Sequence, residues 1–138
     1  MKIRAKINNS QAKQEVALET DGEQHALSIA PKSKGSGSSI NGGELLCLAL
    51  ASCYCNDLYR EAAKLEIHVS SVEVEVEGEF GGEGEPANSL TYRAKIKAAE
   101  DKDRLQDLMR VTDLKAEIQN TLRAGVPVTL GRMEIDSE

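Results

Sequence analysis

The sequence has no tryptophan, a single phenylalanine and no hydrophobic run long enough to cross a membrane. A transmembrane helix requires ~20 consecutive apolar residues, so the sequence predicts no membrane span and no membrane partner. The N-terminal segment, MKIRAKINNS, lacks the apolar centre of a signal peptide. We therefore expect the protein to remain in the cytoplasm.

A basic surface is missing as well. The formal net charge is −6 and the isoelectric point is near 5.0. Proteins that bind nucleic acid need a positively charged face, often with aromatic side chains that stack on bases. The composition favours neither feature, and we expect no nucleic-acid partner. Hydrophobic residues make up 40% and charged residues 29% of the 138-residue chain, which fits one globular domain over residues 1–138.

Cysteine is scarce and odd in number. Because the chain has three cysteines, a fully paired disulfide framework of the secreted kind is excluded. In a reducing compartment we expect these residues to be thiols. Each thiol is then inert packing, a metal ligand or a reactive group. All three, Cys47, Cys53 and Cys55, lie in one apolar segment.

Alternation of apolar and polar residues predicts the strands. They are expected over residues 1–9, 14–20, 23–29, 71–80, 89–98 and 126–135, and the first of them is expected to be half-buried. Asp21-Gly22 marks a hairpin turn between the second and third strands. The fourth strand has an acidic outward face and the fifth a basic one, which favours antiparallel pairing at roughly 0.2–1 kcal/mol per cross-strand pair. We interpret the acidic VEVEVE run as a neutralised, solvated sheet face and not as a cation site.

Residues 101–124 have helical periodicity instead. The apolar stripe changes phase near Thr112-Asp113, which indicates two helical pieces or a kink, and Gly125 followed by Pro127 ends the second piece. The expected order is three strands, a helix, two strands, two helical pieces and a last strand. Antiparallel strands with helices on one side are typical of an α+β fold.

The cysteines lie on the first helix of this order. Asn41 and Glu44 have the spacing of a capping box at its start. From Leu45 to Cys55 only Ser52 is distinctly polar, so this half must be buried on most sides. The polar residues after Cys55 indicate that the second half emerges into water. A chain of this size has little with which to surround a helix, and we expect a homodimer that covers it.

Helical geometry limits what the three thiols can do together. At ~100° per residue, Cys53 and Cys55 lie on opposite faces, and Cys47 and Cys55 are ~12 Å apart along the axis. No pair can form a disulfide without unwinding the helix, and the spacings typical of zinc ligands are absent. We therefore expect no metal and no cofactor.

Two interpretations remain for each thiol. A cysteine in an apolar helix is usually inert packing, and burial raises the pKa of a thiol. We adopt that interpretation for Cys47 and Cys55. Cys53 becomes a nucleophile only where a cation, such as an arginine, approaches it and stabilises the thiolate.

The segment GELLCLALASCYCNDLYREAAKLEIHVSSVEVEVEGEF resembles the OsmC/Ohr family, the osmotically inducible and organic hydroperoxide resistance proteins. The order of elements is also similar over essentially the whole chain. The resemblance implies an intertwined homodimer with antiparallel sheets packed around a long central helix. It also implies a peroxiredoxin-like thiol peroxidase activity in oxidative stress, with Cys53 in the position of the attacking cysteine.

Several residues depart from the family pattern. The stretch AEIQNTLRAGVPV places Ala116 where the resolving cysteine is expected and Glu117 where a proline is expected. In the family, a carboxylate before the helix helps to hold an arginine that activates the cysteine. Gly43 stands at the matching position here, and Glu44 comes one residue later. Glu44 either replaces the family's carboxylate or only caps the helix, and we favour the cap. Arg4 is the only arginine of the N-terminal strands, and its alternation points it outward, so we assign it no catalytic role.

Two functions follow from these observations. The first is a redox protein that reduces a small hydroperoxide with Cys53 and is recycled by an external thiol reductant. The alternative is a dimer of the same fold that has lost turnover and binds a small apolar ligand.

Overall fold

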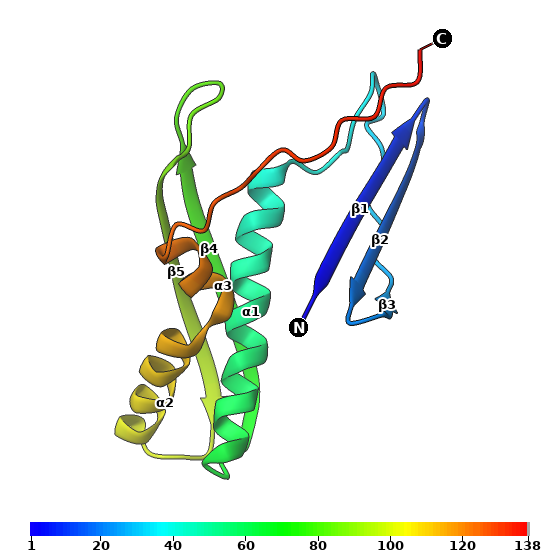
Figure 1. Ribbon diagram of the computed structural model, residues 1–138. Coiled ribbons are helices and arrows are strands. Elements are labelled where there is room, and N and C mark those ends of the chain that lie inside the picture. The colour runs from blue at the N-terminus through cyan, green and yellow to red at the C-terminus, as the bar shows by residue number, and fades with distance from the viewer. Residues whose placement is uncertain (138) are drawn as a thin grey trace. The chain divides into compact units, whose positions relative to one another are not determined.

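A computed structural model describes residues 1–137 (Figure 1). The chain forms two compact units, residues 1–46 and the part that begins at Cys47. Antiparallel strands and a long helix make the fold α+β, as the sequence predicts. The elements are β1 (Ile3–Ser10), β2 (Lys13–Thr20), β3 (Glu23–His25), α1 (Gly42–Lys64), β4 (Val69–Phe80), β5 (Ala87–Ala98), α2 (Lys102–Lys115) and α3 (Glu117–Arg123).

The first unit contains an antiparallel sheet of β1, β2 and β3. The predicted hairpin turn is confirmed, because Asp21 and Gly22 have φ angles of 48° and 87° between β2 and β3. Such positive φ angles at both central residues match the twist of the flanking strands. β3 is shorter than expected and ends at His25. Beyond it, the carbonyl of Ile29 accepts a hydrogen bond from the Gln14 side chain instead of a strand partner.

The expectation that β1 is half-buried is wrong for this unit. All of β1 is exposed, including Ile3 at 61% and Ile7 at 54%. The unit contains only strands, loops and the first turn of α1, so it has no layer of its own to cover this sheet face.

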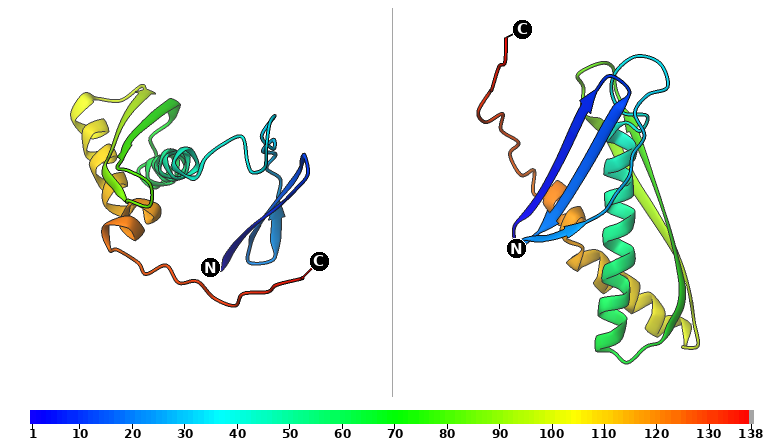
Figure 2. Two further views of the ribbon diagram at one scale, coloured as in Figure 1. Left: turned by 90° about the horizontal axis from the view of Figure 1, so that it is seen from above. Right: turned by 90° about the vertical axis from the view of Figure 1, so that its right-hand side faces the viewer.

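The second unit has a two-stranded sheet of β4 and β5, with α1 and α2 on its apolar face (Figure 1 and Figure 2). The acidic and basic faces pair as predicted. Glu73 lies opposite Lys95 and Glu75 opposite Arg93, whose guanidinium is 2.8 Å from the Glu75 carboxylate. The core under the other face contains Tyr54, Leu58, Ala62, Ile67, Val69 and Leu108.

Two helical pieces follow the sheet, as expected, but the break lies beyond the predicted position. Thr112 is still helical, and its hydroxyl donates to the Leu108 carbonyl at 2.8 Å. The interruption is at Ala116, which is fully buried and has an extended conformation with φ −69° and ψ 110°. Gly125, with a φ of 64°, follows α3 as predicted.

The expected last strand is absent from the described residues. Residues 126–137 have no regular structure, and Val128, Leu130 and Ile135 are 99%, 80% and 89% exposed. A strand requires a neighbour that satisfies its backbone N–H and C=O groups, and no strand within residues 1–137 pairs with this segment. The alternating pattern is present, but the described residues contain no strand paired with it. None of the described helices is long and apolar enough to span a membrane.

Candidate thiol site

The start of α1 is fixed by local hydrogen bonds. Asn41 Oδ1 accepts from the Glu44 N–H at 2.8 Å, and Glu44 Oε1 accepts from the Asn41 N–H at 3.1 Å. This reciprocal pair is the predicted capping box. The contacts found for Glu44 are therefore those of a helix cap.

Within one chain only one stripe of α1 is buried, and Leu48 on the apolar half is 59% exposed, so burial of that half by a second copy stays a prediction. The second half of α1 differs from the prediction, because it does not simply emerge into water. Asp57 and Glu61 are buried, with only 6% and 3% of their surface exposed. The reason is that both carboxylates find charged partners, as described below.

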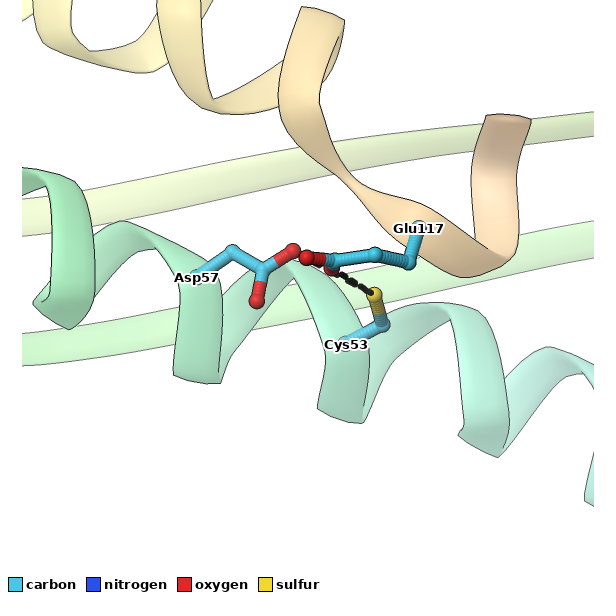
Figure 3. A group of neighbouring side chains, drawn as sticks. All are labelled: Cys53, Asp57 and Glu117. Carbon is cyan, nitrogen blue, oxygen red and sulfur yellow. Dashed lines mark hydrogen bonds between the residues drawn. The ribbon is translucent and has the colours of Figure 1, made fainter. Parts of the chain in front are cut away.

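Cys53 lies on this stripe, one turn before Asp57, and faces the start of α3 (Figure 3). Its Sγ donates to Asp57 Oδ2 at 3.4 Å and lies 3.8 Å from Glu117 Oε2. The backbone N–H of Ile118 donates to the same sulfur at 3.5 Å. The thiol is half-buried and has one donor and two carboxylates around it.

Arg60 holds the other side of the two carboxylates. One of its nitrogens, Nη1, is 3.0 Å from Asp57 Oδ1 and 2.8 Å from Glu117 Oε1. Its Nε also donates to Glu61 at 3.0 Å. Cys53 and Arg60 therefore bind opposite oxygens of the same pair of carboxylates.

The electrostatics of this group favour the thiol over the thiolate. Burial raises the pKa of Cys53, the Ile118 N–H opposes that shift, and the Asp57 charge adds to it. Burial and the adjacent Glu117 also raise the pKa of Asp57. The interactions of Glu117 with Asp57 and Arg60 lower its pKa to about 2. A proton taken up by this carboxylate pair therefore resides on Asp57.

A thiol and two carboxylates at this spacing are also donor types that metal ions accept. Their ligand atoms all lie within 4.8 Å of one another. The Arg60 guanidinium already bridges both carboxylates, however, so the arrangement is held together as a hydrogen-bonded ion-pair network.

Cys47 and Cys55 take no part in this network. All three cysteines are free thiols, and none of them is paired. Cys47 packs near Gly78, where an added Cβ would lie 3.5 Å from its sulfur and 2.8 Å from the Leu90 side chain. The packing role of Cys47 and Cys55 stays a prediction.

A cavity of about 240 Å³ lies beside α3 in the same unit. Its lining is mainly apolar and includes Leu50, Val76, Tyr92, Leu122 and Gln119. Gln119 is 3% exposed; its Nε2 donates to the Leu50 carbonyl at 3.0 Å, and its Oε1 has no partner among residues 1–137. An unpartnered buried acceptor is costly, so this oxygen favours a hydrogen-bond donor.

The family model for the OsmC-like protein matches residues 35–131, which include the helix, the thiol and the start of α3. The chain belongs to this family. The match extends over both units of the chain, and the resemblance found in the sequence is confirmed.

Solved structures of OsmC-like proteins share the fold. An OsmC-like protein from Mycoplasma pneumoniae has a TM-score of 0.63 at 12% identity, over 87% of each chain. An organic hydroperoxide resistance protein from Legionella pneumophila has a TM-score of 0.58 at 20% identity, over 89% of this chain and 90% of that one. Another, from Elizabethkingia anophelis, has a TM-score of 0.60 at 15% identity, over 87% and 88%. At such identities the likeness shows the fold alone. No curated protein sequence matches the chain.

One departure from the OsmC pattern, Glu117, lies at Cys53. Ala116, which the resemblance matches to the resolving cysteine, is fully buried at the break between α2 and α3. Glu117, in the position of the proline, reaches the Cys53 sulfur. Arg4 lies in exposed β1. Sequence reasoning missed the roles of Asp57, Arg60 and Glu117.

Part of this cluster was detectable and part was not. Cys53 and Asp57 are four residues apart on a helix, and Arg60 continues the same stripe, which is a readable signal. Glu117 is 64 residues from Cys53 in sequence, and no periodicity connects them.

Proposed function

We propose that this OsmC-like protein reduces a small hydroperoxide at Cys53 and is returned to its thiol form by an external thiol reductant. The observation that carries the proposal is the state of Cys53. It is a free and partly exposed thiol and accepts the N–H of Ile118. The resemblance in sequence matches it to the family's attacking cysteine. A backbone donor at the sulfur stabilises negative charge that develops there during attack.

The reaction is peroxiredoxin-like. The sulfur attacks the O–O bond, an alcohol leaves, and a sulfenic acid remains on Cys53. Because position 116 is an alanine, the family's internal partner for that sulfenic acid is missing. An external thiol therefore forms a mixed disulfide with Cys53 and releases water, and a second thiol frees the enzyme. We place this chemistry in the cytoplasm, where such thiols are kept reduced.

The decisive variant is Cys53→Ser. We expect it to abolish hydroperoxide consumption measured with a dithiol reductant, because serine cannot form the sulfenic acid. Cys47→Ser and Cys55→Ser are matched controls on the same helix and should retain the rate. A Cys53→Ser rate equal to that of the wild type would reject the proposal.

We further propose that the active form is a homodimer. The support is the exposed apolar surface of the chain, on α1 and on residues 126–135. An intertwined dimer would cover the helix and give the unpaired C-terminal segment a strand partner.

The second candidate function is binding of a small apolar ligand without turnover. The observation that favours it is the cavity beside α3, with its apolar lining and the unpartnered oxygen of Gln119. A small alcohol or amide would supply the missing donor. Native mass spectrometry or thermal shift with such compounds should detect binding that Gln119→Leu weakens. Sulfenic acid trapping at Cys53 with steady turnover would instead favour the redox function.

A further inference from the structure

The charged groups at the Cys53 sulfur are not those of an arginine-activated thiol. Two carboxylates, Asp57 and Glu117, contact the sulfur, and Arg60 binds their far oxygens. Within the described part of the unit that begins at Cys47, no side-chain nitrogen donates to the sulfur, whose only donor there is the Ile118 backbone. Its shortest side-chain contact is with the Asp57 carboxylate, at 3.4 Å. An oxygen acceptor at that distance accepts the S–H hydrogen, which is the first requirement for taking up the proton.

We propose that Asp57 is the catalytic base that accepts the Cys53 proton, with Arg60 and Glu117 as the positioning residues that aim its carboxylate. This inference rests on the proposed function, because it assigns roles within the same site. It gives the chain a route to sulfur attack without a cation at the sulfur.

The step balances without any further reactant. As the sulfur attacks the distal oxygen of the hydroperoxide, the S–H proton moves to Asp57 Oδ2 and an S–O bond forms. The O–O bond breaks, and the alkoxide that leaves takes the proton back from Asp57. Sulfur is oxidised from thiol to sulfenic acid, the peroxide is reduced to an alcohol, and Asp57 ends as it began.

The surrounding charges explain why Asp57 and not Glu117 takes the proton. Glu117 comes from α3, is more exposed and binds the same Arg60 nitrogen at 2.8 Å. Asp57 is buried on α1, and burial raises its pKa toward that of the thiol. Farther along the network, Glu61 engages Lys64 of α1 and Lys115 of α2, so neither lysine binds Asp57.

The experiment compares two rates at Cys53 in the full chain. One is sulfenic acid formation by cumene hydroperoxide in a single turnover, and the other is alkylation by iodoacetamide. Asp57→Asn should slow the first by ~10-fold or more, because it removes general-base help. It should accelerate the second severalfold at pH 8, because removing a negative charge beside the sulfur favours the thiolate.

Opposite changes in the two rates are a signature that a purely structural role would not produce. Asp57→Glu keeps a carboxylate and should recover part of the oxidation rate, which guards against misfolding of the asparagine variant. Asp107→Asn, which removes an exposed carboxylate on α2, is the matched control and should alter neither rate.

Arg60 has its own test in the pH profile of oxidation. Without the guanidinium the pKa of Asp57 rises, so Arg60→Gln should move the acid limb of the profile to higher pH. Arg60→Lys restores a positive charge and should return the limb toward its wild-type position.

Two outcomes separate the inference from the function on which it rests. If wild-type Cys53 forms no sulfenic acid, the proposed function fails and the base assignment fails with it. In the other outcome, wild-type Cys53 forms sulfenic acid, and Asp57→Asn forms it at least as fast and is also alkylated faster. Asp57 then only raises the pKa of the thiol and does not act as a base. That result overturns the base assignment and leaves the redox function intact.

Discussion

Glu66 has a left-handed backbone conformation, with a φ of 56°, two residues after α1 ends at Lys64. There the Ile67 N–H donates to the Ala62 carbonyl at 2.9 Å and the Glu66 N–H donates to the Ala63 carbonyl at 3.1 Å. These two bonds are those of a Schellman motif, which places glycine at the left-handed position in most helices. The motif turns the chain so that Ile67 and Val69 enter the core.

Glu66→Gly should therefore stabilise the protein. A non-glycine residue in the left-handed region costs roughly 1–2 kcal/mol in steric strain. Glycine removes this strain, but it loses more backbone entropy on folding, which offsets part of the gain. We expect the free energy of unfolding to rise by about 0.5–1 kcal/mol, measured by urea denaturation. Ala63→Gly, three residues earlier within the helix, is the opposite control and should lower stability by about 1 kcal/mol. A lower urea midpoint for Glu66→Gly would contradict the assignment.

At the scale of elements, α1 and α2 are joined by one buried carboxylate. Glu61 of α1 contacts Arg60 at 3.0 Å and Lys64 at 2.8 Å, and Lys115 at the end of α2 is 2.9 Å away. Three cations around one buried acid satisfy it fully. They also fix the end of α2, and hence the start of α3, beside Cys53.

Glu61 should make stability depend on pH. Its hydrogen bonds to Lys64, Lys115 and Arg60 lower its pKa from 4.5 to about 2. A carboxyl with a lower pKa in the folded state stabilises the fold above the unfolded pKa, and that stabilisation is lost as pH falls toward the folded pKa. The stability gap between wild type and Glu61→Gln should thus be full at pH 6 and should narrow from pH 4.5 toward pH 2.

Urea midpoints of both proteins across this range provide the check. Asp107→Asn removes an exposed acid with a 3.6 Å contact to Arg110 and should show no comparable gap. A gap for Glu61→Gln that stays constant with pH would mean that packing and not charge supports α2.

At the scale of the whole molecule, features set by neighbours in sequence were predictable, and features set by distant parts were not. The Asn41 cap, the Asp21-Gly22 turn and the pairing of β4 with β5 depend on residues close in sequence or on an alternating pattern. The contact of Glu117 with Cys53 depends on how α3 folds back onto α1, which no local pattern encodes. The strand expected over residues 126–135 failed for another reason. Its pattern is real, but pairing depends on a second strand, and none of the described strands pairs with it.

The same reasoning predicts how the molecule behaves in solution. Leu48 lies on the apolar half of α1 and is 59% exposed. In the proposed homodimer a second copy of the chain would cover this half of the helix. We expect light scattering to give about twice the 14.9 kDa mass of one chain. Leu48→Glu should shift the protein to the monomer and lower its melting temperature, because a charge buried at an interface without a partner is unfavourable. Gln106→Glu adds the same charge on exposed α2 and should leave the dimer unchanged. A wild type that is monomeric at high concentration would leave the apolar face of α1 without this explanation.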